Sequence, residues 1–512
     1  MTLPTVALFL GLGCIAPTQA TQPAQTDAAT AQRDDGETKA AHDDAATPPK
    51  SFTSQHVGTF HGREVAYTAT VSETILENDK REREASIWSI AYVQDGVTAP
   101  DRRPVTFLWN GGPGSASLWL HMGAFGPKRV DVPSDARDDG GPPYGLLDNT
   151  GAFLDVSDVV FIDPVGTGFS RVLGKSEGKD FWGVRQDARS IARFIRQWIT
   201  KSGRWNSPKF IGGESYGTTR AAAVVHELEG RFDDVAINGI LLISTILDFT
   251  LDSNTTGNEL GYVTMLPTMA ATARFHGKTG GEVPLEVFVQ QAREFALNGY
   301  AHALLQGEAL AAEERARVRK ELARFTGLSE SYLELANLRV RPDRFQKELL
   351  RERGLTVGRL DSRYTGQDLD AAGESPDEDP SFYGIDGAYA TALNAYLRGP
   401  LKVDLPDSYK VIGGLGGPWD WELDDPFYFN VAPYIGEAMR QNSGLRVFVA
   451  SGYYDMATPF FGAEYSLNRS GVVPARLSFA YYEAGHMMYV NHASLAKLQQ
   501  DVHDFVLQTV AR

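Results

Sequence analysis

Two early stretches of the chain, residues 64–75 and 85–94, alternate between apolar and polar side chains. A period of two predicts antiparallel strands with one buried face. The runs VTFLW (105–109) and VVFID (159–163) are almost wholly apolar, which is typical of strands buried on both faces. The pattern therefore predicts a sheet that begins with half-buried strands and continues with fully buried ones.

Helical periodicity separates the later strands. Residues 181–200 carry apolar side chains at helical spacing, and residues 218–230 form a second helix-like stretch that follows a short strand. Strands and helices that alternate in this way predict an α/β fold. The other elements expected from the pattern are strands at 209–213, 445–451 and 477–482 and a last helix from Ser494.

Residues 281–355 have a different pattern. Apolar residues recur at helical spacing, with Ala, Glu, Arg and Leu between them, and no buried-strand run interrupts them. We therefore expect one α/β domain, formed by residues 52–251 and 401–512, that is interrupted by a mostly helical insertion at 252–400.

The start of the chain lacks the pattern of a folded domain. Residues 5–16 form an apolar block that is shorter than the roughly 20 residues of a membrane span, and small residues up to Ala20 follow, which predicts a secretory signal peptide at 1–20. Residues 21–51 have almost no large apolar side chain, which predicts a disordered linker. We expect export from a bacterial cell, to the periplasm or the medium; acylation of Cys14, as in a lipoprotein, is the lesser alternative.

Composition excludes several classes of function. The chain has 512 residues, 42% of them apolar, and a formal charge of -16. This negative charge disfavours a nucleic-acid partner. It also disfavours stable association with an anionic membrane, unless Cys14 is lipidated. Cys14 is the single cysteine. This excludes a disulfide within the chain, cysteine-ligated zinc, and cysteine catalysis in the mature part.

The segment GESYG (213–217) fits the pattern G-x-S-x-G and stands between a predicted strand and a predicted helix. In this setting the serine occupies a tight turn at the carboxyl end of the sheet, and small neighbours let other backbone approach it. The sequence therefore predicts that Ser215 is a nucleophile.

A serine nucleophile needs a base and a third group that orients the base. In this architecture the chain order is serine, acid, histidine. Asp455 and His486 each follow a predicted strand in that order, whereas His492 and His503 fit the last helix and are interpreted as structural. Asp455 and His486 are therefore the expected acid and base.

An oxyanion site is expected in the segment WNGGPG (109–114), which follows the buried strand at 105–109. Glycines in such a loop let backbone N–H groups point inward without side chains in the way. Two fixed donors aimed at a developing oxyanion stabilise the transition state by several kcal/mol.

Motifs of the serine carboxypeptidase family of α/β-hydrolases resemble four segments of this chain: WNGGPGSAS, GESYG, SGYYDMATP and AGHMM. The resemblance extends over the chain after the linker, including the helical insertion between nucleophile and acid. It implies that Ser215 is the nucleophile, His486 the base and Asp455 the orienting acid. The backbone N–H groups of Gly112 and Tyr216 would form the oxyanion hole.

The same resemblance implies that Asn110 and Glu214 bind the free carboxylate of the substrate. Two positions depart from the family pattern: Ser115 stands where the family has a cysteine, and Ala124 stands where it commonly has a glutamate. That glutamate shares a proton with the counterpart of Glu214. In this chain, burial or another group must keep Glu214 protonated.

The resemblance implies a serine carboxypeptidase that removes C-terminal residues from peptides through an acyl-enzyme. An esterase, an acyltransferase or a hydroxynitrile lyase on the same scaffold stays open, because a fold and a triad do not fix the reaction. A non-catalytic binding protein is disfavoured, since all three triad residues are present. We expect neither a metal nor a dissociable cofactor, because the serine mechanism needs none and no metal-ligand spacing occurs in the sequence.

Overall fold

The computed structural model describes residues 47–229, 234–252, 255–423 and 428–511. The signal peptide expected at 1–20 lies outside these residues, as does most of the linker expected at 21–51. Within the described ranges, no helix is both long and apolar enough to cross a membrane.

The described residues form a ten-stranded mixed sheet with the order β1-β2-β3-β7-β4-β9-β10-β13-β14, in which β8 pairs with β3. Its antiparallel part contains β1 (Ser51–Phe60), β2 (Arg63–Glu77), β3 (Arg83–Gln94) and β8 (Arg171–Val172). Its parallel part contains β7 (Asp158–Asp163), β4 (Val105–Trp109), β9 (Lys209–Ser215), β10 (Gly239–Thr245), β13 (Arg446–Gly452) and β14 (Leu477–Tyr482). β3 joins the two parts by pairing antiparallel with β7.

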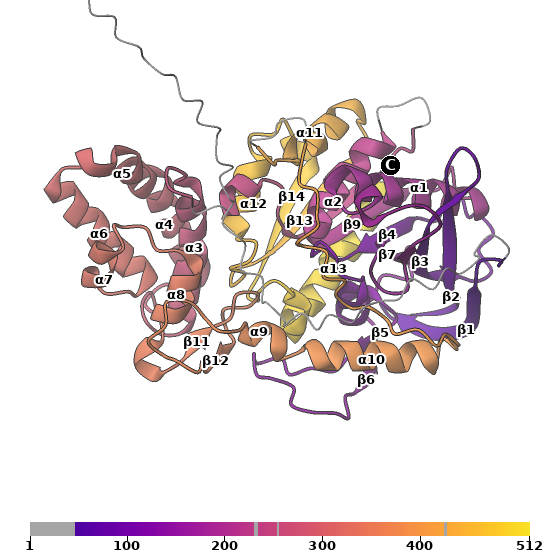
Figure 1. Cartoon of the computed structure of the whole chain (residues 1–512), viewed down its shortest axis with the longest axis horizontal. Helices are drawn as coiled ribbons and strands as arrows, with labels where there is room; N and C mark the ends of the chain where they lie inside the picture. The colour runs from indigo at the N-terminus through magenta and orange to yellow at the C-terminus, as the bar shows by residue number, and fades with distance from the viewer. Residues whose placement is uncertain (1–46, 230–233, 253–254, 424–427, 512) are drawn as a thin grey trace, which may run out of the picture. The chain divides into compact units, whose positions relative to one another are not determined.

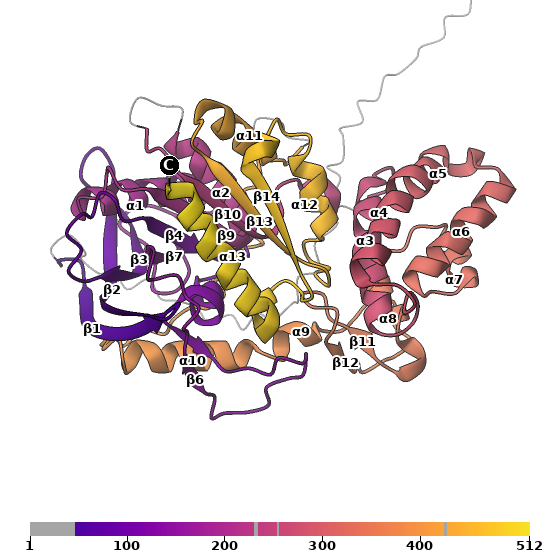
Figure 2. The ribbon, with the colours of Figure 1, turned by 180° about the vertical axis from the view of Figure 1, so that it is seen from behind.

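The parallel strands are buried because helices cover both faces of the sheet. One face packs against α1 (Val184–Lys201), α2 (Tyr216–Leu228) and α11 (Ala432–Gln441), and the other packs against α10 (Asp386–Arg398) and α13 (His492–Val510). Figure 1 shows the first group of helices, and Figure 2 shows α13 lying across the strands. The mostly parallel sheet between helices confirms the predicted α/β class.

The apolar runs locate the buried strands well. β4 coincides with the predicted run VTFLW, and β7 begins one residue before the predicted run at 159–163. The strand β14 also coincides with its prediction at 477–482, but most of its residues are only partly buried. β10 was not predicted, although its sequence GILLIST is buried at every residue. It lies between β9 and β13, so it completes the path of parallel strands from the nucleophile turn to the acid loop.

The insertion contains a helical group with its own apolar core (Figure 1). Its helices are α3 (Leu260–Phe275), α4 (Leu285–Phe295), α5 (Ala301–Gln306), α6 (Ala312–Thr326), α7 (Glu330–Leu335) and α8 (Pro342–Glu348). The short pairs β5 (Lys128–Val130) with β6 (Leu146–Asp148) and β11 (Thr356–Val357) with β12 (Thr365–Gly366), and the helices α9 (Pro380–Tyr383) and α12 (Phe460–Leu467), complete the elements used below.

The expected insertion at 252–400 divides between two cores. Side chains from α3 to β11 pack with one another, whereas those of α10 pack in the core beneath the sheet. Tyr453, Tyr454 and Met456, from the loop after β13, join the helical core. The loop that carries the expected acid therefore packs directly against the insertion.

Candidate active site

Ser215 is the last residue of β9, and α2 begins at the next residue. Its backbone lies at φ 62°, ψ -132°, a conformation that residues other than glycine rarely adopt. Within GESYG, Ser215 alone is partly exposed, and its four neighbours are buried. The strand-to-helix turn therefore presents the serine side chain and encloses the residues around it.

Glycines let the predicted oxyanion loop reach this turn. A Cβ on Gly111 would lie 2.6 Å from the backbone nitrogen of Tyr216, and one on Gly213 would lie 2.2 Å from the carbonyl oxygen of Gly217. The indole N–H of Trp109 donates to that same carbonyl at 2.8 Å. The loop after β4 and the turn after β9 thus meet backbone to backbone.

Gly112 and Tyr216, the expected oxyanion donors, both belong to this contact region. Gly112 has φ +100°, which is a glycine conformation. Tyr216 is the first residue of α2, so its N–H has no acceptor within the helix. An N–H that the helix leaves free, next to the nucleophile, is suited to an oxyanion, and the pairing of Gly112 with Tyr216 stays a prediction.

Asp455 and His486 form a buried hydrogen-bonded pair. The Nδ1 atom of His486 lies 2.8 Å from Oδ2 of Asp455, and the two residues are 4% and 0% exposed. Asp455 also accepts hydrogen bonds from the backbone N–H groups of Ala457 and Thr458, each at 2.9 Å, and from the Thr458 hydroxyl at 2.6 Å. A carboxylate fixed in this way favours the His486 tautomer with a proton on Nδ1, which leaves Nε2 free to act as a base.

The pKa of His486 lies above its usual value of 6.5. Burial lowers this pKa, but the charge of Asp455 and its hydrogen bond raise it, and the raising effects prevail. The charge of Glu214 adds to the increase. His486 therefore holds its proton more tightly than a free histidine does.

A short segment of the insertion bridges the acid loop and the histidine loop. The His486 N–H donates to the carbonyl of Leu360 at 2.6 Å, and the Met456 N–H donates to the carbonyl of Arg359 at 3.0 Å. In return, the Ser362 N–H donates to the carbonyl of Tyr454 at 3.0 Å. We call residues 359–363 the bridging segment, because it contacts the backbone on both sides of the Asp455–His486 pair.

A buried ion pair stiffens the bridging segment. The guanidinium of Arg363 contacts the carboxylate of Asp361, and both residues are less than 10% exposed. Asp361 accepts from the N–H of Gly485 at 3.2 Å, and Arg363 donates to the carbonyl of Glu483 at 3.1 Å. The pair thus attaches the insertion to the loop just before His486.

Ser244, at the end of β10, supports His486 from the sheet side. Its hydroxyl donates to the His486 carbonyl at 2.6 Å, and its backbone has φ 50°. The sequence analysis missed both Ser244 and the bridging segment. Neither has a local motif, since their role arises from contacts over more than 90 residues of chain.

Glu214 and Asn110, the expected carboxylate-binding residues, are adjacent and buried. The Asn110 amide N–H donates to Oε1 of Glu214 at 3.0 Å, and its oxygen accepts from the Leu120 N–H at 3.0 Å. Burial raises the pKa of Glu214 to about 7, although the charge of His486 and the Tyr489 hydroxyl lower it. Burial, helped by the charge of Asp455, therefore keeps a proton on Glu214 up to about neutral pH.

Aromatic side chains surround the position where the family's glutamate is missing. Ala124 is fully buried in the one-turn π-helix η1 (Leu120–Phe125). A Cβ on its neighbour Gly123 would lie 2.4 Å from the ring of Tyr489 and 2.7 Å from the hydroxyl of Tyr389. The Tyr489 hydroxyl interacts with the Glu214 carboxyl and lowers its pKa. A tyrosine hydroxyl thus lies beside Glu214, near the position where the family has a second carboxylate.

Arg220 is a further residue that the sequence analysis missed. It is fully buried on α2, pairs with Asp187 of α1 at 2.6 Å, and donates to the backbone carbonyl of Asn110. Its guanidinium also lies over the Tyr216 ring, 5.2 Å from the centroid. Arg220 therefore joins the oxyanion loop, the nucleophile turn and the helix layer beneath them.

We expect Arg220→Leu to lower the free energy of unfolding by about 3–5 kcal/mol, because it leaves the Asp187 carboxylate buried without its partner. Urea unfolding followed by circular dichroism measures the change. The control is the double variant Asp187→Leu/Arg220→Leu, which removes both charges and should recover part of the loss. Equal destabilisation in the single and double variants would contradict this account of the pair.

Comparison with known proteins agrees with this geometry. The serine carboxypeptidase family model matches residues 82–280. Serine carboxypeptidase-like 16 of Arabidopsis thaliana is 28% identical over 163 residues, which are 30% of this chain and 36% of the plant protein. The pheromone-processing carboxypeptidase KEX1 of Saccharomyces cerevisiae is 34% identical over 109 residues, 21% of this chain and 13% of the yeast protein. The matched stretches thus span about a third or less of these relatives.

Likeness in structure extends further than likeness in sequence. The crystal structure of Kex1(Δ)p, a prohormone-processing carboxypeptidase from Saccharomyces cerevisiae, aligns with 85% of this chain and 91% of its own at a TM-score of 0.52 and 15% identity. At that identity the likeness shows the fold alone. The chain has the α/β-hydrolase fold, and its residues 82–280, which contain both the oxyanion loop and the nucleophile turn, are similar to the serine carboxypeptidase family.

Proposed function

We propose that this protein is a serine carboxypeptidase that removes C-terminal residues from peptides. The observation that carries the proposal is that Glu214, buried and hydrogen-bonded to Asn110, directly precedes the strained Ser215. A carboxyl group that stays protonated up to about pH 7 can donate a hydrogen bond to a substrate carboxylate. Next to a nucleophile, such a group selects peptides cleaved at their free end.

Each step of the proposed reaction uses a residue placed above. His486 takes the proton of the Ser215 hydroxyl through Nε2 while Ser215 Oγ attacks the last peptide carbonyl. The N–H groups of Gly112 and Tyr216 stabilise the oxyanion. His486 then gives its proton to the leaving amino group, which departs as the free C-terminal amino acid. A water molecule, deprotonated by His486, hydrolyses the acyl-enzyme and regenerates Ser215.

An esterase, an acyltransferase and a hydroxynitrile lyase remain the alternatives on this scaffold. None of them requires a buried proton donor that recognises a carboxylate. A panel of matched substrates separates the possibilities: a blocked dipeptide with a free C-terminus, its C-terminal amide, and an ester of the same acyl group.

We expect kcat/KM at pH 6 to be at least about tenfold higher for the free dipeptide than for the amide, because one hydrogen bond to a charged group contributes about 1.5–3 kcal/mol. Glu214→Leu, which retains most of the volume, should remove this preference while ester hydrolysis persists. Equal rates for the free dipeptide and the amide in the unaltered enzyme would favour the esterase alternative.

The proposal includes export of the protein from a bacterial cell to the periplasm. It is supported by the apolar block at 5–16, by the small residues up to Ala20, and by the lack of cysteine after residue 20. Fractionation of cells that express the full chain tests it. We expect a periplasmic product whose N-terminus, read by mass spectrometry, begins after residue 20.

A further inference from the structure

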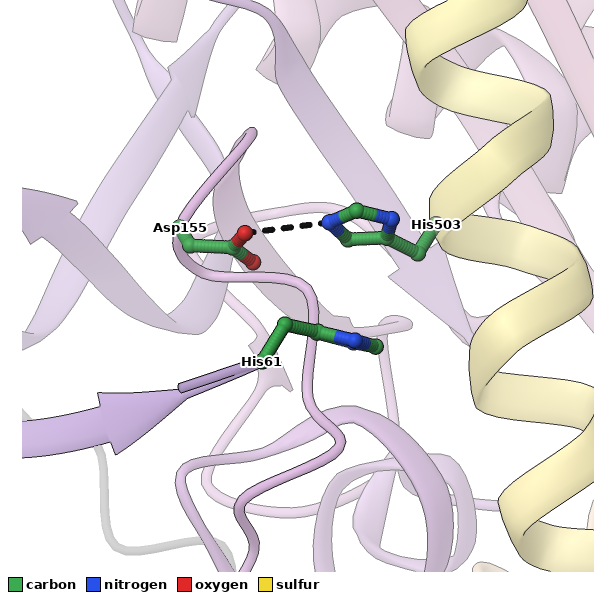
Figure 3. A group of neighbouring side chains, drawn as sticks. All are labelled: His61, Asp155 and His503. Carbon is green, nitrogen blue, oxygen red and sulfur yellow. Dashed lines mark hydrogen bonds and ion pairs between the residues drawn. The ribbon is translucent and has the colours of Figure 1, made fainter. Parts of the chain in front are cut away.

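Two histidines and an aspartate from distant parts of the sequence meet away from the active site (Figure 3). His61 lies in the turn between β1 and β2, Asp155 lies in the loop before β7, and His503 lies on α13. One ring nitrogen of each histidine and one carboxylate oxygen lie within 4.8 Å of one another. The sequence analysis expected no metal site and interpreted His503 as structural, because no spacing along the chain links these residues.

We propose that His61, Asp155 and His503 form a binding site for a divalent transition-metal ion of the Zn²⁺ class. Two imidazoles and one carboxylate are a ligand set that suits Zn²⁺ and its neighbours in the first row, with water in the fourth position. Ca²⁺ and Mg²⁺ prefer oxygen ligands, so the proposed site should discriminate against both.

The Asp155–His503 contact already has the spacing of two ligands on one ion. Asp155 Oδ2 lies 3.0 Å from His503 Nε2. With metal–ligand bonds of about 2.0–2.2 Å, neighbouring ligand atoms on one ion lie roughly 3–3.5 Å apart. The ion would therefore replace this hydrogen bond with little movement of either side chain.

Asp155 also has a second carboxylate oxygen, Oδ1, that is available to a metal ion. Its side chain is 9% exposed, and its Oδ1 has no hydrogen-bond partner among the described residues. A buried carboxylate oxygen without a partner is costly, and a bound cation removes that cost. The nearby guanidinium groups of Arg63 and Arg103 contact the backbone carbonyl of Asp155, at 3.4 and 3.3 Å, so they leave the carboxylate to the cluster.

His61 has the outer contact that a metal ligand usually has. His61 Nε2 lies 3.0 Å from the carbonyl of Gly151, so the Nε2–H donates there and Nδ1 keeps its lone pair for the ion. His503 presents Nε2 to Asp155, and its Nδ1, 3.6 Å from a carboxylate oxygen of Asp504, makes no hydrogen bond among the described residues. A ligating histidine commonly donates its second N–H to a carbonyl or carboxylate, which fixes the tautomer and orients the ring.

The two rings are stacked, with centroids 4.0 Å apart and planes at 28°, and Figure 3 shows Asp155 facing the edge of the His503 ring. His61 is held in place by its backbone N–H, which donates to Thr150 at 2.8 Å. His61 and His503 are both partly exposed, so an ion from solvent can reach them.

The site lies far from the catalytic residues. Asp155 precedes the amino end of β7, whereas Ser215 is the carboxyl-terminal residue of β9 and Asp455 follows the carboxyl end of β13. His503 lies three turns along α13 from its start near His486, about 16 Å of helix. The ion would therefore tie the β1–β2 turn, the loop before β7 and α13 together without entering the reaction.

Zinc titration of EDTA-dialysed enzyme tests the proposal, with isothermal calorimetry for stoichiometry and a thermal melt for stability. We expect one Zn²⁺ per chain and a Tm rise of about 2–5 °C at a hundredfold excess of zinc over Kd. Mg²⁺ and Ca²⁺ should give no rise. The kcat of the enzyme should be the same with and without zinc.

Loss of a contact that orients a metal ligand lowers affinity about 10–100-fold, so His61→Ala or His503→Gln should weaken zinc binding by more than about 100-fold. His61→Ala is expected to keep the fold, because the side chain that it removes is partly exposed. The control is His226→Ala: His226 lies 3.5 Å from Glu437 on the surface, a histidine–carboxylate pair with no third metal ligand among the residues that the structure describes. Zinc binding that survives His61→Ala and His503→Gln, or an unaltered enzyme that binds no zinc, would overturn the proposal.

Discussion

Ser215→Ala should lower kcat by about 10⁶-fold while leaving the fold unchanged. Loss of the serine of a catalytic triad costs about that much in kcat, because the oxyanion donors and the binding residues alone supply little of the rate. Steady-state assays with a blocked dipeptide measure the loss, and circular dichroism with a thermal melt checks the fold. The alanine lacks only the hydroxyl, so the buried neighbours of Ser215 keep their contacts.

A second readout ties the loss to nucleophilic chemistry. A serine-directed phosphonate should label the unaltered enzyme once per chain, on Ser215, and should not label Ser215→Ala. Ser244→Ala is the matched control, because Ser244 is a second strained serine at the end of a neighbouring strand. The Ser244→Ala variant should still be labelled on Ser215. Hydrolysis at the original rate by Ser215→Ala would rule out the triad.

Hydrolysis of peptides with a free C-terminus should fall about tenfold per pH unit above pH 7, reaching about 100-fold at pH 9, while hydrolysis of the matched amide does not fall. The pKa of Glu214 is raised to about 7 by burial, so the proton-donating form decreases tenfold for each unit above that value. Once ionised, Glu214 repels the substrate carboxylate. The amide carries no such charge and depends only on neutral His486.

Toward acidic pH, both substrates should lose activity as His486 gains a proton, and its raised pKa places this loss at higher pH than for a free histidine. The free peptide therefore has a narrow optimum between the losses caused by His486 and by Glu214. Glu214 and His486 interact electrostatically, so one proton is shared between them and the two apparent pKa values belong to the pair. Measurements of kcat/KM from pH 5 to 9 for both substrates supply the two profiles.

Substitution of Tyr489 tests the decline of peptide hydrolysis above pH 7. Its hydroxyl lowers the pKa of Glu214, so Tyr489→Phe should move the decline of peptide hydrolysis to higher pH and leave the amide profile in place. Tyr389→Phe is the control, since Tyr389 contacts the same Gly123 site but is not among the groups that shift the pKa of Glu214. Identical declines for peptide and amide in the unaltered enzyme would contradict the role of Glu214.

The sequence predicts the fold well where burial is uniform along a segment. The runs that became β4 and β7 needed only their apolar character, because a strand between helix layers has no polar face. The division of the insertion between two cores was not predictable in this way. The apolar residues of α10 have the same helical spacing as those of α4, and spacing does not tell which core a helix will join.

The candidate site was predictable in the parts that follow from strand order. Ser215 ends β9, Asp455 and His486 lie in loops after β13 and β14, and the structure brings Asp455 and His486 into contact. Arg220, Ser244 and Tyr489 were missed, because each acts on a residue far away in the sequence or in another element. The cluster of His61, Asp155 and His503 was missed for the same reason, since the strands and helices bring it together without a local motif.

The bridging segment limits how the insertion of this protein can be exchanged between relatives. An insertion that only covers a site can be exchanged between relatives as a module, and selectivity then changes while the chemistry is inherited intact. Here the same insertion supplies Leu360, whose carbonyl holds the backbone of His486, and Asp361, which holds Gly485. Exchange of residues 252–400 as a block should therefore change selectivity and turnover together. Hybrids that keep the original residues 359–363 are the ones that should be active.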